Sequence, residues 1–118
     1  METNIDGKPK IDIDTFLKTE ITVGQILSVE QIEGSEKLLK LSVDFAEGSP
    51  RQILSGIRKY FPEEQVLVGK KCLFVTNLEP RMMMGMESNG MLFALSDDTG
   101  NFSLLEPNEA IAVGTKAH

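Results

Sequence analysis

The chain has 118 residues, enough for one compact domain that buries its own core without disulfides or a metal. Its formal net charge of −6 excludes indiscriminate binding to polyanions, because phosphate contacts need lysine and arginine. No apolar run approaches the length of a membrane-spanning helix, and the single Cys72 cannot form an internal disulfide. We therefore expect a cytoplasmic protein with no membrane association.

The residue types needed for common catalytic sites are missing or badly placed. The only histidine, His118, is the last residue, where a loosely held tail is expected. That argues against a Ser–His–Asp triad, a Cys–His pair or a zinc site built on His/Cys spacing. Neither GxGxxG nor GxxxxGK[ST] occurs. We expect no enzyme activity, no catalytic or metal-binding residues and no cofactor, which makes binding the default role.

The first elements follow a polar, acidic leader, residues 1–13, which has no secretory signal. Residues 14–118 are expected to form the domain. A short helix through Phe16 and Leu17 can be capped by Asp14, and Asp12 is the other candidate. The strand ITVGQILSVEQI follows, with Gly24 suggesting a bend or bulge. Its alternation predicts one face made of Ile21, Val23, Leu27 and Val29.

The middle of the chain carries the clearest strand signals. LLKLSVDF alternates regularly, which predicts Leu39, Leu41, Val43 and Phe45 inside the domain. RQILSGI is a third strand, followed by a connector with a helical turn at Pro62-Glu63-Glu64. KKCLFVTNL is a continuous apolar strand, which predicts burial on both faces.

The last third is richer in turns. NLEPRMMMGMES is expected to be a long loop and GMLFAL a fifth strand. SDDTGN predicts a hairpin turn before FSLLEP, and the tail NEAIAVGTKAH can supply one more short strand. Short strands bent by glycines favour an all-β domain that closes into a small barrel, with a sandwich as the other choice.

The charge is distributed unevenly along the chain. Residues 51–91 carry six bases and four acids, a net of +2, whereas residues 1–50 and 92–118 have nets of −5 and −3. A basic face on an acidic body would favour a selective anionic partner.

Several separated motifs carry a resemblance to a known family. VGQILSVEQIEGSEKLLKLSVD, RQILSGI, NLEPR, and Gly85 followed by ESNGMLFA together resemble the tRNA-binding domain family over about residues 14–116. The resemblance implies a five-stranded OB-fold barrel with short helical segments and N- and C-terminal extensions. It also implies a homodimer whose C-terminal extension serves dimerisation.

The same resemblance implies the function. Members of this family bind tRNA by shape and backbone contacts, as stand-alone proteins or as C-terminal domains of methionyl-tRNA synthetases, and catalyse nothing themselves. A synthetase partner is therefore left open. The alternative is a peptide-binding secretion chaperone of the CsaA type, which shares the dimeric barrel. The methionine cluster, the pI of about 4.8, and Met82 in place of the family's usual lysine favour that alternative.

The resemblance also implies the site residues. The candidates for RNA contact are Arg81, Ser88, Met91, Lys37, Lys40, Arg51 and Asn77. Arg81 can fork onto a phosphate or stack on a base, but can equally pair with Glu79 or Glu87. Met91 can contact a base or pack in the core. For the two lysines, simple solubility is an equal alternative.

Overall fold

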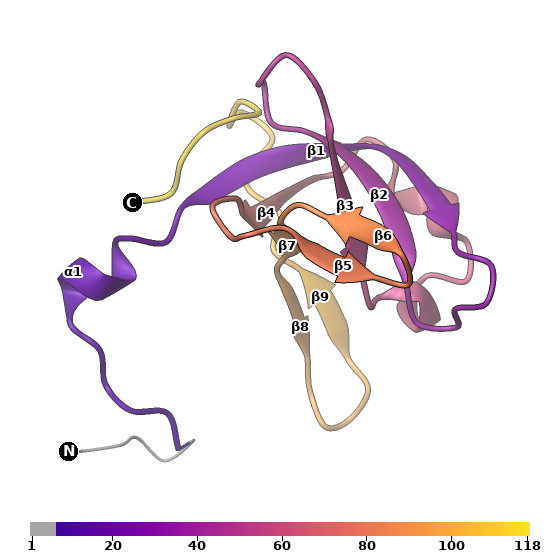
Figure 1. Cartoon of the computed structure of the whole chain (residues 1–118), viewed down its shortest axis with the longest axis horizontal. Helices are drawn as coiled ribbons and strands as arrows, with labels where there is room; N and C mark the ends of the chain where they lie inside the picture. The colour runs from indigo at the N-terminus through magenta and orange to yellow at the C-terminus, as the bar shows by residue number, and fades with distance from the viewer. Residues whose placement is uncertain (1–6) are drawn as a thin grey trace.

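The computed structural model of the chain describes residues 7–118. Five antiparallel strands form the main sheet in the order β3-β2-β1-β4-β7, and this sheet curls into a nearly closed barrel (Figure 1). Their bounds are Ile21–Gln31 for β1, Leu39–Asp44 for β2, Arg51–Ser55 for β3, Lys71–Val75 for β4 and Met91–Leu92 for β7. The predicted all-β, five-stranded barrel is confirmed.

The long strand β1 curls across the barrel and pairs with β4 through its first half and with β2 through its second. The β1–β2 register shifts between Ile26 and Ser28, which makes Leu27 the extra residue of a bulge. Leu27 is 47% exposed, and Ile26 is buried instead. The predicted inward position of Leu27 is therefore wrong, because a bulge reverses the alternation that the prediction assumed.

The sequence also suggested a bend or bulge at Gly24, but the structure needs glycine there for a different reason. A Cβ added at Gly24 would lie 2.5 Å from Cε1 of Phe45 and 2.6 Å from Cγ1 of Val43. Glycine therefore lets β1 pass closely over two core side chains.

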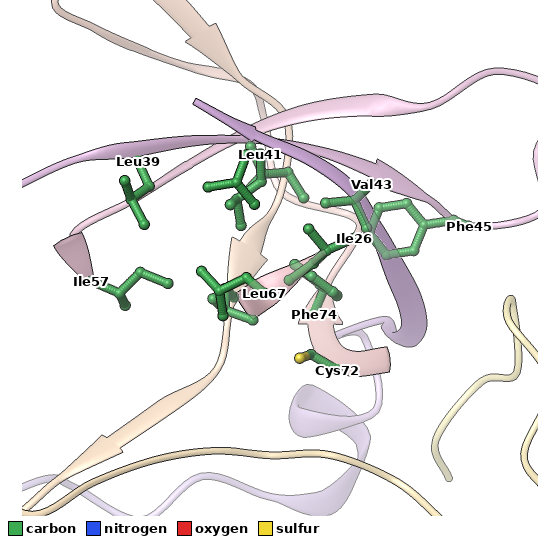
Figure 2. Close-up of a cluster of buried hydrophobic side chains, with 12 residues drawn as sticks. Ile26, Leu39, Leu41, Val43, Phe45, Ile57, Leu67, Cys72 and Phe74 are labelled. Carbon is green, nitrogen blue, oxygen red and sulfur yellow. The ribbon is translucent and has the colours of Figure 1, made fainter. Parts of the chain in front are cut away.

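The core confirms the alternation predicted for β2. Leu39, Leu41 and Val43 are fully buried and Phe45 nearly so, and they point towards Ile26, Leu67 and Phe74 from other elements (Figure 2). The rings of Phe45 and Phe74 meet edge to face at 5.1 Å. Cys72 also lies in this core, where burial raises the pKa of its thiol to about 11, so the thiol stays protonated and shielded.

The helical segments are short. Asp12 caps α1 (Ile13–Phe16) by accepting a 2.7 Å hydrogen bond from the Thr15 backbone N–H, which decides between the two candidate caps. Two 3-10 turns, η1 (Arg58–Tyr60) and η2 (Glu64–Leu67), lie on either side of Pro62. The helical turn predicted at 62–64 is thus misplaced: Leu67 is fully buried, and its packing places the second turn later in the chain. No helix within residues 7–118 is long and apolar enough to cross a membrane.

Two small hairpins are added to the barrel. β5 (Arg81–Met83) pairs with β6 (Met86–Ser88), so the long loop predicted for this stretch is wrong. Met84 and Gly85 form its two-residue turn with φ of 51° and 77°, the geometry of a tight hairpin without the usual Asn-Gly signal. β8 (Ala94–Ser96) pairs with β9 (Phe102–Leu104) across the predicted turn. Phe102 anchors this second hairpin by stacking on Tyr60 at 4.1 Å.

The two ends of the described chain behave differently. α1 stands apart from the barrel and buries no residue (Figure 1). The C-terminal residues run beside the first half of β1, where Thr22 and Lys116 form an isolated bridge. The extra strand expected in the tail is reduced to that bridge.

Candidate functional site

A groove runs between the barrel and the β5–β6 hairpin. Its main part encloses about 650 Å³ and adjoins a second depression of about 670 Å³. The two share Gly56 and Met83, and we call them together the hairpin groove. The main part is lined by Leu54, Ser55, Gly56, Asn77, Leu78, Glu79, Arg81, Met83, Ser88, Gly90, Met91 and Leu92. The second part is lined by Gly34, Ser35, Glu36, Lys37, Leu38, Gly56, Met83 and Met84.

Five of the seven candidate residues line this groove. Arg81, Asn77, Ser88 and Met91 belong to its main part, and Lys37 belongs to the second part. The fold thus gathers residues that are separated by more than 50 positions in the sequence. Contact of each with RNA stays a prediction.

The two cations of the groove are available to a ligand. The exposed guanidinium of Arg81 and the ammonium of Lys37 form no hydrogen bond or ion pair with any side chain of residues 7–118. The salt bridge from Arg81 to Glu79 or Glu87 considered as an alternative does not form. Glu79 and Glu36 also line the groove, so its formal charges cancel.

The hairpin divides the methionines between its two faces. Alternation puts Arg81 and Met83 on the face that lines the groove, and Met82 on the opposite face, where it is 65% exposed. Met84 at the turn and Met91 on β7 complete the apolar lining. Met91 is 44% exposed while Leu92 is buried, so Met91 is a surface residue rather than a core residue. The lysine that Met82 replaces would therefore lie outside the groove.

Two of the lining residues already have structural partners. Ser88 is only 5% exposed, and its Oγ accepts a 3.0 Å hydrogen bond from the Leu54 backbone N–H. Asn77 accepts from the Glu20 N–H at 2.8 Å and donates to the Lys18 carbonyl at 2.7 Å. Both side chains hold the walls of the groove; Ser88 is buried, whereas the exposed Asn77 amide keeps a donor and an acceptor site for a ligand.

Arg51 and Lys40 lie outside the groove. Arg51 forms two hydrogen bonds of 2.7 and 2.8 Å with Glu47, donates to the Thr76 carbonyl at 2.7 Å, and lies over the Phe45 ring. The bonds from Arg51 lower the pKa of Glu47. Lys40 pairs with Glu30 at 2.7 Å. Glu47 is only four residues before Arg51, whereas the Thr76 carbonyl and the Lys40–Glu30 pair join segments that no local pattern connects.

Two groove residues could not be found from the sequence pattern. Leu78 continues the apolar run of β4, which predicts a buried position. The structure instead leaves it 47% exposed in the lining of the groove. Met83 lies in a stretch that was expected to be a loop, so the face to which it points could not be predicted. No group of three or more His, Cys, Asp or Glu within residues 7–118 could hold a metal ion.

Comparisons with known proteins agree with this geometry. The family model described as "Putative tRNA binding domain" matches residues 21–116. Methionine–tRNA ligases of Lactococcus lactis subsp. lactis and Methanocella arvoryzae are 44% and 46% identical over 91% and 92% of this chain. The matches span only 16% and 15% of those ligases.

Solved structures share the whole architecture. A MetRS related protein from Pyrococcus horikoshii superposes with a TM-score of 0.84 at 37% identity, covering 94% of this chain and 100% of that one. The chaperone CsaA from Bacillus anthracis superposes with a TM-score of 0.81 at 24% identity, covering 93% and 100%. At that identity the second likeness concerns the fold alone.

Proposed function

Because the chain belongs to the tRNA-binding domain family, we propose that it binds folded tRNA through the hairpin groove without catalysing a reaction. It acts in the cytoplasm, either free or as an auxiliary subunit or domain of methionyl-tRNA synthetase. The similarity to methionine–tRNA ligases supports that association, and this chain corresponds to only 16% of such a ligase. The catalytic site of the ligase therefore has no counterpart in these residues.

The observation that carries the proposal is the side chain of Arg81. Its guanidinium is exposed at the groove and has no partner within residues 7–118. A guanidinium can hold a phosphate with two parallel hydrogen bonds or lie flat on a base. Met91 beside it offers a polarizable thioether to the face of an unstacked base. The groove therefore combines a phosphate contact with a surface for bases, which suits the exposed loops of a folded RNA.

The acidic body limits the strength of this binding. Among residues 7–118, only Arg81 and Lys37 supply free cations at the groove, and Glu36 and Glu79 oppose them. Each phosphate contact contributes roughly 0.7 to 0.9 to the slope of log affinity against log salt. We expect a shallow slope of about 2, in contrast to the steep slopes of strongly basic RNA-binding proteins.

A binding titration tests the proposal. Fluorescence anisotropy with labelled tRNA should show Arg81→Ala binding about 10- to 100-fold more weakly, because a charge-assisted hydrogen bond of roughly 1.5–3 kcal/mol is lost. Lys70→Ala is the matched control: Lys70 lies outside the groove and pairs with Glu106 at 3.5 Å. The proposal is rejected if wild type fails to bind tRNA at low salt, or if both variants bind alike.

A second candidate function has one observation in its favour. Met82, Met84 and Met91 are all strongly exposed, and flexible methionine-rich surfaces suit peptides of varied sequence. A chaperone of the CsaA type would bind an unfolded peptide here, and that binding would change little with salt. Peptide affinity that persists at high salt in a protein without tRNA affinity would favour this function.

We also propose that the protein is a homodimer. Ile13, Phe16 and Leu17 of the α1 segment are 66%, 49% and 59% exposed, and α1 buries nothing in its own chain. An apolar segment of this kind is typical of one that packs on another copy. Light scattering should report twice the chain mass of 13.0 kDa, and Phe16→Asp should shift the protein towards the single-chain mass. Val66→Asp, at an equally exposed position on η2, is the control; a single-chain mass for wild type at micromolar concentration contradicts the proposal.

A further inference from the structure

Within residues 7–118, the exposed sulfur atoms are concentrated at one place. Of the six methionines, five lie between Met82 and Met91, and Met83, Met84 and Met91 line the hairpin groove. The one thiol, Cys72, is fully buried in the core. An oxidant in solution therefore reaches thioethers at the groove before it reaches the cysteine.

Met84 occupies a special position among them. It has a φ of 51°, a left-handed conformation that costs a non-glycine residue free energy. Its side chain is 55% exposed, yet its terminal methyl carbon lies 3.7 Å from where a Cβ on Gly34 would be. The tip of the hairpin thus lies close to the loop between β1 and β2, across the second part of the groove.

Oxidation of these thioethers would change the groove chemically. A hydroperoxide transfers one oxygen atom to the sulfur lone pair, its O–O bond breaks, and water or an alcohol leaves. The sulfur is oxidised to a sulfoxide and the peroxide is reduced, so the exchange balances without a further reactant. The product is a polar, chiral group in place of a flexible apolar one, and methionine sulfoxide reductases reverse the change.

We propose that Met83, Met84 and Met91 form a methionine-sulfoxide modification site, at which a hydroperoxide weakens the groove's hold on its ligand. The identity of that ligand rests on the proposed function; the reactivity of the sulfur atoms and the response of the hairpin do not. Three sulfoxides would remove the apolar surface offered to a base and disturb the contact of Met84 with the loop at Gly34. The effect is reversible, which distinguishes a switch from damage.

Hydrogen peroxide serves as the probe for the first test. After limited treatment of the intact protein, peptide mass mapping should find Met82, which lies outside the site, and Met84 and Met91 within it oxidised fastest, the less exposed Met83 and Met86 more slowly, and Cys72 unmodified. The exposures of the first three, 65%, 55% and 44%, set this order. Equal rates at all five methionines, or oxidation of Cys72 first, would overturn the site.

Matched variants test the consequence. Peroxide should weaken tRNA binding by wild type about 10-fold, and a sulfoxide reductase with a thiol reductant should restore it. Met82→Leu removes an exposed thioether on the opposite face of the hairpin, so it should respond like wild type. The triple variant Met83→Leu, Met84→Leu, Met91→Leu should bind before and after peroxide with the same affinity, since leucine keeps the volume without the sulfur. Single leucine variants replace the triple variant if that fails to fold.

One further measurement separates this inference from the proposed function. If untreated protein does not bind tRNA, the proposed function fails, and hydrogen exchange of the amides of residues 81–88 then decides the inference. Oxidation should speed that exchange in wild type and in Met82→Leu but not in the triple variant. Unchanged exchange in oxidised wild type, or unchanged tRNA affinity where binding exists, overturns the proposal.

Discussion

Ser88 illustrates how one side chain can belong to two regions of the molecule. It lines the hairpin groove, yet its hydroxyl accepts a hydrogen bond from the Leu54 N–H, which joins β6 to β3. The neighbouring Asn89 N–H donates to the Gln52 carbonyl at 2.8 Å. These two bonds connect the first hairpin to the strand that closes the barrel.

We expect Ser88→Ala to lower the free energy of unfolding by about 1–3 kcal/mol, because the buried Leu54 N–H would lose its partner. Urea denaturation measures the change. Ser28→Ala, at an exposed position on β1, should stay within about 0.5 kcal/mol of wild type. Equal stability of Ser88→Ala and wild type would mean that water or another group satisfies the Leu54 amide.

At this scale the sequence predicted what strand alternation governs and little more. It placed Leu39, Leu41 and Val43 correctly, and it failed at Leu27, where the bulge adds a residue. It could not show that Asn77 is held by Lys18, 59 positions away. Alternation is a local property of one strand, whereas hydrogen-bond partners are chosen by the folded topology.

At the scale of elements, the β5–β6 hairpin is the main departure from expectation. Four methionines, a glycine and no β-branched residue give it no strand signal, and it forms because its two ends are fixed. Pro80 restricts the backbone entering it, and Ser88 ties its exit to β3. The hairpin is thus a consequence of the barrel rather than of its own propensity.

The turn of this hairpin offers a test of backbone strain. Met84→Asn would create an Asn-Gly turn, in which asparagine tolerates a positive φ far better than methionine does. We expect slower hydrogen exchange of the amides of residues 81–88, equivalent to about 0.5–1 kcal/mol of added local stability. Met82→Asn, on a strand with ordinary φ, should bring no such protection; faster exchange in Met84→Asn would show that the methionine contact at Gly34 outweighs the strain.

At the scale of the whole molecule, a polar network joins the two ends of the described chain. The carboxylate of Glu20 accepts from the Thr76 hydroxyl at 2.5 Å and pairs with Lys116 at 3.1 Å. Thr22 and Thr76 share a buried hydrogen bond of 2.6 Å. The bond from Thr76, followed by the contact with Lys116, lowers the pKa of Glu20. The C-terminal segment is therefore held to β1 and β4 by an ionised carboxylate.

The lowered pKa of Glu20 makes the free energy of unfolding depend on pH. A carboxylate whose pKa is lower in the folded state stabilises the fold above its unfolded pKa of about 4.3, and this contribution is lost as pH falls through the folded value. Two other carboxylates act in the same direction: hydrogen bonds from Arg51 lower the pKa of Glu47, and hydrogen bonds from Asn101 and Thr99 lower the pKa of Asp97 to about 2. We expect unfolding free energy to decrease on acidification below about pH 5.

Urea denaturation between neutral pH and about pH 3 measures this dependence. Glu20→Gln should be less stable than wild type at neutral pH and should depend less on pH, whereas Glu109→Gln should follow the wild-type curve. If the unfolding free energies of Glu20→Gln and wild type changed with pH in parallel, the Glu20 network would not explain the pH dependence.

The barrel fold could be predicted from the sequence, because the motifs are spread along the chain and together resemble one family. The location of the groove was not, since its walls come from β3, the segment after β4, the β5–β6 hairpin and β7. Residues 51–91, the net basic third of the chain, supply most of these walls, but Arg81 is the one of their six bases that lines the main part of the groove.

The separation of the β5–β6 hairpin from the core has a consequence for what the groove can hold. None of its residues belongs to the hydrophobic core cluster, and Met84 at its tip lies close to Gly34 in the loop between β1 and β2. Substitutions at its exposed positions, such as Met82 and Met84, therefore leave the barrel core intact, whereas Ser88 is tied to β3. Exchange of these few exposed side chains would therefore alter what the groove holds, while the buried positions of the barrel stay the same.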